Sequence, residues 1–135
     1  MLIKIKVNGE LRSADVPPET TLLKMLRESF DLTGTKLGCD VGDCGTCTVI
    51  VDGVSVNSCL MLAGRANGSE ITTIEGLADS NTLHPLQEKF EEHGALQCGF
   101  CGPGIEMMPI WSGCMCYNHC ENNVFRVISR FWLFQ

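Results

Sequence analysis

Four cysteines in the first half of the chain constrain its fold more than any other feature. They follow the spacing C-x4-C-x2-C-x11-C, and they are Cys39, Cys44, Cys47 and Cys59. The first three lie in one short loop, and the fourth comes twelve positions after the third. This spacing is typical of four thiolates that hold one [2Fe–2S] cluster. The chain must therefore fold so that a tight loop and a later segment meet at one point.

Glycines accompany the cysteines of this loop. Gly38, Gly42 and Gly45 remove side chains where the backbone must wrap closely, and glycine adopts positive φ without steric cost. In so small a loop, backbone N–H groups can point at the sulfur atoms, and such contacts help set a reduction potential. We therefore expect a compact loop whose backbone surrounds the thiolates.

The composition restricts the class of protein. The chain has 135 residues, nine cysteines and a formal net charge of −6, a length that suits one domain or two very small ones. No basic patch is visible, so nucleic-acid binding is not expected, and no apolar run approaches the roughly 20 residues of a membrane span. The sequence shows no secretory leader. We expect a cytoplasmic protein, because clustered cysteines in that reducing compartment bind metal more often than they form disulfides.

The first 30 residues predict a hairpin followed by a helix. Residues 2–7 alternate between apolar and polar side chains, and Asn8-Gly9 is a strong signal for a tight hairpin turn. A second strand is expected over 11–16. The spacing of Leu22, Leu23, Leu26 and Phe30 predicts a helix over 22–30 with a threonine cap at position 20 or 21.

Three more strands are predicted after the cysteine loop. They are expected over 48–51, 54–57 and 70–74. A hairpin, a crossing helix and further strands form a β-grasp order. This order places the cysteine loop at one edge, near the surface, where an electron carrier must approach its partner.

The second half predicts a linker and short helices. Residues 76–81 read as the linker, Pro85 suits the first turn of a helix, and Gly94 would end that helix. Its apolar stripe is predicted to be Leu83, Leu86 and Phe90. A C-x2-C pair follows at Cys98 and Cys101. Pro103 would begin another helix, which Pro109 would interrupt.

Residues 105–135 have a different composition. They hold six of the nine aromatic residues and only two acidic ones. Helical spacing predicts an apolar helix near residues 124–134, which is too short to span a membrane. The same region holds three further cysteines, Cys114, Cys116 and Cys120.

Several motifs, taken in order, resemble those of one family. They are Val7-Asn8-Gly9, Gly38–Thr48, Val51-Asp52-Gly53, Asn57-Ser58-Cys59-Leu60, Thr73–Leu77, Leu83–Gln87 and Gln97–Cys101. The chain resembles the small iron–sulfur subunit of the molybdenum hydroxylases, a group that includes xanthine dehydrogenase, aldehyde oxidoreductase and aerobic carbon monoxide dehydrogenase. The resemblance covers residues 1–104.

The resemblance implies two [2Fe–2S] clusters. The first would use Cys39, Cys44, Cys47 and Cys59, and the second would use Cys98, Cys101, Cys114 and Cys116. Gln97 would approach the pterin of a molybdopterin-binding large subunit, and electrons would leave toward an FAD-binding subunit or another acceptor. No catalytic constellation is visible in the chain itself, so its role would be electron transfer within an oxidoreductase.

The tail departs from the family pattern. Only twelve residues separate Cys101 from Cys114, where the family has a longer helix-forming segment, and Cys120 has no counterpart. We interpret residues 105–135 as an atypical tail that was truncated, recombined or read in a shifted frame.

These observations predict an α+β fold. Residues 1–76 would form a β-grasp domain of the plant-type ferredoxin kind, and residues 77–135 a small, shortened all-α [2Fe–2S]-binding domain. Two alternatives stay open: a free-standing carrier that uses the first cluster alone, and a structural metal-binding adaptor. Zinc fits the first four cysteines poorly, because structural zinc sites favour paired C-x2–4-C knuckles. For Cys98 and Cys101 alone, the alternative is a thioredoxin-like redox pair.

Overall fold

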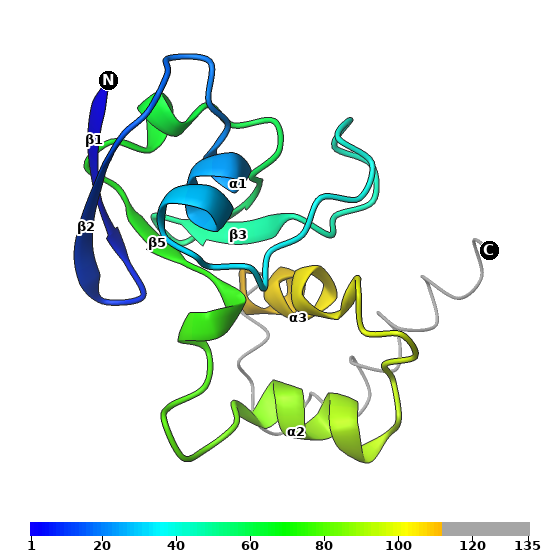
Figure 1. Ribbon diagram of the computed structural model, residues 1–135. Coiled ribbons are helices and arrows are strands. Elements are labelled where there is room, and N and C mark those ends of the chain that lie inside the picture. Colours follow the sequence, from blue (N-terminus) through cyan, green and yellow to red (C-terminus); the bar gives the residue numbers. More distant parts are fainter. Residues whose placement is uncertain (112–135) are drawn as a thin grey trace.

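The computed structural model describes residues 1–111 of the chain (Figure 1). Its strands are β1 (Leu2–Val7), β2 (Glu10–Asp15), β3 (Thr48–Val51), β4 (Val54–Asn57) and β5 (Glu70–Thr72). Its helical segments are α1 (Leu22–Lys24), η1 (Met25–Ser29), η2 (Ala63–Ala66), η3 (Ile74–Gly76), α2 (Pro85–Glu92) and α3 (Gly102–Trp111). Within residues 1–111, no helix is long and apolar enough to cross a membrane.

The five strands form one mixed sheet in the order β2-β1-β5-β3-β4. β1 and β2 pair as an antiparallel hairpin, as do β3 and β4. β5 joins the two hairpins, because it runs parallel to β1 and antiparallel to β3. At the first turn, Asn8 and Gly9 have φ values of 50° and 85°, which are the positive values that a tight hairpin needs. The predicted α+β class is confirmed.

The first helix packs on one face of this sheet. The alternating residues Ile3, Ile5 and Val7 are each 1% exposed, and Leu22 and Leu26 are fully buried against them. Each such side chain stabilises the fold by roughly 1.5–3 kcal/mol. This core holds the sheet on which the cysteine loop is built.

The helix predicted over 22–30 changes its hydrogen-bonding pattern after one turn. It begins as α1, where the Thr21 hydroxyl accepts a bond from the Lys24 N–H at 3.2 Å. It continues as a π-helix over Met25–Ser29. Met25 is fully buried, although the predicted stripe did not include it. Side-chain spacing at the α-helical period does not reveal such a widened turn.

The two C-terminal helices of the described chain lie beside the sheet. Figure 1 shows α3 between β3 and α2. The imidazole Nδ1 of His84 caps α2 by accepting from the Leu86 N–H at 3.2 Å, and the Gln87 side chain accepts from the His84 N–H at 3.1 Å. Gly94, with φ of 58°, follows the helix end as predicted.

Three predictions for these segments are wrong. Leu83 is 45% exposed, because it precedes the helix start and lies outside the buried stripe. The strand predicted over 70–74 ends at Thr72, since a 3-10 turn begins at Ile74. The helix that begins at Gly102 continues through Pro109 to Trp111. A proline can kink a helix without ending it, because it removes one hydrogen bond and its ring displaces the carbonyl of the preceding turn.

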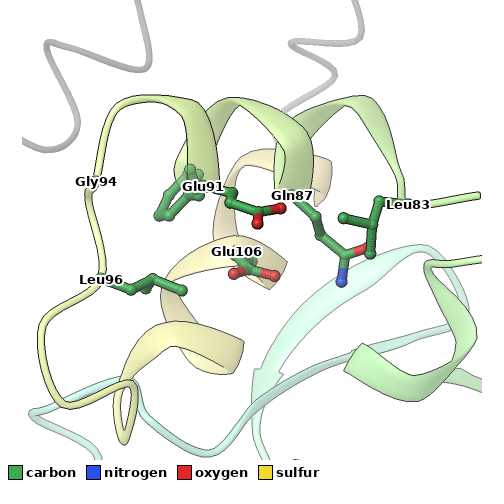
Figure 2. A pocket seen from close by; sticks show the side chains of 7 residues that line it. Leu83, Gln87, Glu91, Gly94, Leu96 and Glu106 are labelled. Atoms are coloured by element: carbon green, nitrogen blue, oxygen red, sulfur yellow. The ribbon is translucent and has the colours of Figure 1, made fainter.

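A pocket of about 390 Å³ separates α2 from α3 (Figure 2). Gln87 and Glu91 face it from α2, and Glu106 faces it from α3. Glu106 is only 6% exposed. Burial raises the pKa of its carboxyl group, and a hydrogen bond with Gln87 partly opposes that shift. Among residues 1–111, Glu106 is the only buried acidic side chain.

Candidate metal centre

The loop from Cys39 to Cys47 is shaped by residues in the left-handed region. Asp40, Gly42 and Gly45 have φ values of 59°, 80° and 69°. Gly38 serves the loop differently: a Cβ at that position would lie 2.7 Å from the Cys44 Sγ. The predicted roles of these glycines, positive φ and close approach, are both confirmed.

The Cys39 sulfur is surrounded by backbone N–H groups. Those of Val41, Asp43 and Cys44 donate to its Sγ at 3.4, 3.3 and 3.3 Å. These bonds, led by that of Cys44, lower the pKa of the Cys39 thiol to about 6. Cys39 is therefore mostly a thiolate at neutral pH, which is the form that ligates a metal.

The four cysteines are arranged as two pairs. Cys39 and Cys44 share a side-chain hydrogen bond on the exposed side of the loop, and Cys47 and Cys59 share one on the buried side. Burial, followed by the bond with Cys47, raises the pKa of Cys59 to about 11. Leu23 packs against the inner pair. The structure thus brings a sequence-distant cysteine to the loop, as predicted.

Several hydrogen bonds hold the β4 end against this loop. The Ser58 hydroxyl and N–H both donate to the Cys47 carbonyl, at 2.6 and 3.3 Å, and the Asn57 side chain donates to the Gly42 carbonyl at 3.1 Å. The Thr48 hydroxyl donates to the Gly45 carbonyl at 2.6 Å. Sequence reasoning assigned no role to these three polar residues. The only feature of the sequence that could have indicated these roles is that each residue lies within two positions of a cysteine.

The pairwise arrangement of the four cysteines fits a two-iron cluster. A [2Fe–2S] cluster divides its four thiolates between two irons. The observed pairs, Cys39 with Cys44 and Cys47 with Cys59, match that division. The N–H donors at Cys39 would also stabilise the negative charge of a bound cluster.

The second set of predicted ligands is only half within the described chain. Cys98 and Cys101 are both exposed on the loop that leads into α3, and Gly99 between them has φ of 81°. Gln97 is exposed beside them. The predicted ligands Cys114 and Cys116, the extra Cys120 and the apolar segment near 124–134 lie outside the described residues.

Known families match both parts of the chain. The family described as 2Fe-2S iron-sulfur cluster binding domain matches residues 5–78, which is more than half of the chain, and the [2Fe-2S] binding domain family matches residues 73–112. The chain belongs to the small iron–sulfur subunits of the molybdenum hydroxylases. The resemblance seen in the sequence is thereby confirmed, and with it the binding of a [2Fe–2S] cluster.

Individual relatives agree with this assignment. The aldehyde oxidoreductase iron-sulfur-binding subunit PaoA of Escherichia coli K12 is 51% identical over 104 residues, which are 77% of this chain and 45% of that protein. The nicotinate dehydrogenase small FeS subunit of Eubacterium barkeri is 50% identical over 103 residues, which are 76% of this chain and 66% of that protein. The chain therefore spans less than two thirds of the length of these two curated relatives.

Solved structures of related enzymes share the fold. Quinoline 2-oxidoreductase from Pseudomonas putida 86 superimposes with a TM-score of 0.78 and 38% identity, over 95% of this chain and 90% of the matched one. Aldehyde oxidoreductase from Desulfovibrio gigas also gives a TM-score of 0.78, with 42% identity over 83% of this chain and 12% of that much longer one.

Proposed function

We propose that this chain is the electron-transfer subunit of a multi-subunit molybdenum-dependent oxidoreductase. The observation that supports the proposal is the pair of cysteine contacts in residues 39–59, Cys39 with Cys44 and Cys47 with Cys59, in a chain of this family. A [2Fe–2S] cluster, when bound, accepts and releases one electron at a time. The chain's own task is to hold that cluster, to fix its charge and to present it to a partner.

The residues of the first site divide these tasks. Cys47 and Cys59, 3% and 5% exposed, would hold the cluster from the protein interior. Cys39 and Cys44 would hold it from the solvent side. The N–H groups around Cys39 disperse negative charge, which tunes the potential. Val41 and Leu60 are 71% and 57% exposed. They add apolar surface beside the cysteine loop, which suits contact with a protein partner.

The second cluster belongs to the same proposal. Cys98 and Cys101 would hold it together with Cys114 and Cys116, and Gln97 would lie near the pterin of the molybdopterin-binding large subunit. Electrons would pass from that subunit to the Cys98–Cys101 site, then to the Cys39–Cys59 site, and on to an FAD-binding subunit. The exposure of Gln97, Cys98 and Cys101 supports this order, because an entry point must be reachable by a partner.

We place this complex in the cytoplasm, where thiols remain reduced. All six cysteines of the described residues are free.

The chain should be purified anaerobically from cells that also express its neighbouring genes. Iron, labile sulfide and the EPR spectrum of the reduced protein should then be measured. Two distinct signals with a co-purifying molybdenum-containing chain are the expected result. One signal without a partner would instead support a free-standing carrier, and zinc without sulfide would support a structural adaptor.

A further inference from the structure

Residues 33–36 form the entrance segment of the cysteine loop, and charged side chains bind its backbone. Arg27, on the π-helix η1, donates from one guanidinium nitrogen to the Thr33 carbonyl at 2.8 Å and to the Thr35 carbonyl at 2.7 Å. The Lys36 ammonium group also donates to the Thr33 carbonyl, at 2.9 Å. Hydrogen bonds from charged donors are stronger than those between neutral groups. Cations therefore hold carbonyl groups of the entrance segment in place.

An acidic side chain binds an N–H group of the same segment. The Gly34 N–H donates to the Glu75 Oε1 at 2.7 Å, and the Thr73 hydroxyl donates to the Glu75 Oε2 at 2.7 Å. Thr73 is fully buried. Its N–H donates to the Asn8 Oδ1 at 2.9 Å, and the Asn8 amide donates to its hydroxyl at 2.9 Å. Glu75 therefore connects the entrance segment to the turn that follows β1.

Gly34 allows the entrance segment to approach the turn that carries Glu75. A Cβ at Gly34 would collide with the Ile74 side chain and would lie 2.7 Å from the Glu75 Oε1. Arg27 comes before the cysteine loop in the chain, and Glu75 comes after it. The entrance segment is therefore fixed between two elements that are distant from each other in sequence, and each element binds a different kind of backbone group.

The entrance segment lies directly before Cys39. Only Leu37 and Gly38 separate the two. A Cβ at Gly38 would lie 2.7 Å from the Cys44 Sγ, so the backbone enters the loop in contact with a second sulfur. The Cys39 Sγ accepts three backbone N–H bonds, at 3.4, 3.3 and 3.3 Å, and hydrogen bonds weaken steeply when their angle departs from linearity. A displaced entrance segment would therefore weaken the bonds to the Cys39 sulfur.

We propose that Arg27 and Glu75 are positioning residues for the first cluster site. Together they fix the entrance segment and thereby keep the Cys39 sulfur among its N–H donors, and neither residue ligates the cluster. Those donors stabilise negative charge on a bound cluster, so their loss makes its midpoint potential more negative. The inference rests on the proposed function, because it requires a [2Fe–2S] cluster at the four cysteines of residues 39–59.

Two pairs of variants separate positioning from the effect of charge alone. Glu75→Ala and Glu75→Gln both remove one negative charge, but glutamine keeps an oxygen that can accept from the Gly34 N–H. Arg27→Met and Arg12→Met both remove one positive charge, but Arg12 donates to the Phe30 carbonyl at 3.1 Å, which lies outside the entrance segment. Because the change in charge is the same within each pair, a difference in potential reports the hydrogen bonds to the entrance segment.

The midpoint potential is measured by redox titration of the full chain, followed by EPR, in about 1 M salt, where charges are screened beyond about 3 Å. The signal that persists in Cys98→Ala identifies the first cluster. Arg27→Met should have a more negative potential than Arg12→Met, and Glu75→Ala a more negative potential than Glu75→Gln. Arg27→Met and Glu75→Ala should also lose the cluster several-fold faster than their controls. Equal potentials within a pair would overturn the role of that residue, even if its variant melts at a lower temperature.

Amide hydrogen exchange of the cluster-free chain provides a second readout, which does not require a variant to retain the cluster. The N–H groups of Val41, Asp43 and Cys44 should exchange several-fold faster in Arg27→Met and Glu75→Ala than in the matched controls. The core amides of β1 should exchange at the same rate in all variants, because the sheet stays folded. Equal exchange of the three loop amides within both pairs would overturn the proposal.

The two readouts distinguish failure of this inference from failure of the proposed function. If the unmodified chain binds no [2Fe–2S] cluster at the first site, the proposed function fails, and hydrogen exchange still decides whether the entrance segment positions the loop. If the cluster is present and the potentials agree within both pairs, only the positioning inference fails. If Arg27→Met does not fold, the comparison at Glu75, an exposed residue, decides the question by itself.

Discussion

The two cysteine sites differ in how much of the fold supports them. At the first site, two thiols are buried under Leu23, and the loop is held by the Ser58 hydroxyl and by three N–H groups on Cys39. At the second site, Cys98 and Cys101 are both exposed. The cysteines of the first motif lie within 21 consecutive residues, 39–59, whereas two of the four predicted ligands of the second site lie beyond residue 111. We therefore expect the first site to form with the sheet, and the second to depend on those further ligands.

The largest effect is expected when one predicted ligand is removed from each site. Cys47→Ala should abolish the first cluster, halve the iron content and lower the melting temperature, because metal binding contributes to folding. Cys98→Ala should remove only the second cluster and leave the first EPR signal intact. Iron analysis and EPR of both variants provide the measurement. Loss of both signals in Cys98→Ala would contradict the independence of the first site.

The second test uses the opposite pKa shifts within the first site. In the cluster-free protein, alkylation of Cys39 should rise with pH around its pKa of about 6, because the thiolate is the reactive form. Cys59, with a pKa of about 11, stays protonated and buried, so it should remain unmodified at pH 8. Mass spectrometry after brief iodoacetamide treatment measures which of the two cysteines is alkylated first. Equal modification of both residues at pH 8 would disprove the asymmetry.

A smaller effect is expected at Ser58. Ser58→Ala removes the buried hydroxyl that donates to the Cys47 carbonyl, which should cost about 1 kcal/mol because the Ser58 N–H still serves that carbonyl. Denaturant unfolding of the loaded protein measures the loss. Ser13→Ala on the exposed face of β2 is the control and should change little. An equal loss of stability in both variants would show that Ser58 does not support the site.

The smallest effect concerns the helices beside the second site. The pKa of Glu106 is raised by burial, so its ionisation opposes folding above the unfolded-state pKa and has no such effect when the acid is protonated. Glu106→Gln should therefore stabilise the protein at pH 8, by less than the loss expected for Ser58→Ala, and leave it unchanged at pH 4. Thermal unfolding at both pH values tests this. Equal stabilisation at the two pH values would show that the charge is not responsible.

Much of the first region could be predicted from the sequence. β3 and β4 have the predicted bounds, and Asn8-Gly9 forms the predicted turn, with positive φ at both residues. These features are local: alternation and turn chemistry act between near neighbours. The cysteine spacing predicted that Cys59 would reach the loop, and the structure places it beside Cys47.

The remaining features depend on contacts between distant segments. The parallel pairing of β1 with β5 and the π-helix at Met25–Ser29 have no local signature. The pKa difference between Cys39 and Cys59 also arises from three-dimensional surroundings, since both residues are cysteines of one motif. For Cys114 and Cys116, which lie outside the described residues, participation in a second cluster remains a prediction.

The position of Leu23 has a consequence for damage and repair. It packs against Cys47 and Cys59, which are nearly inaccessible, while Cys44 is exposed on the other side of the loop. Susceptibility of sulfur to oxidation follows exposure and thiolate character. Exposure to oxygen should therefore modify the outer pair first and spare the inner pair. A protein that has lost its cluster would then keep two reduced anchors in place, and reduction of a disulfide or sulfenic acid at the outer pair would make it ready for a new cluster.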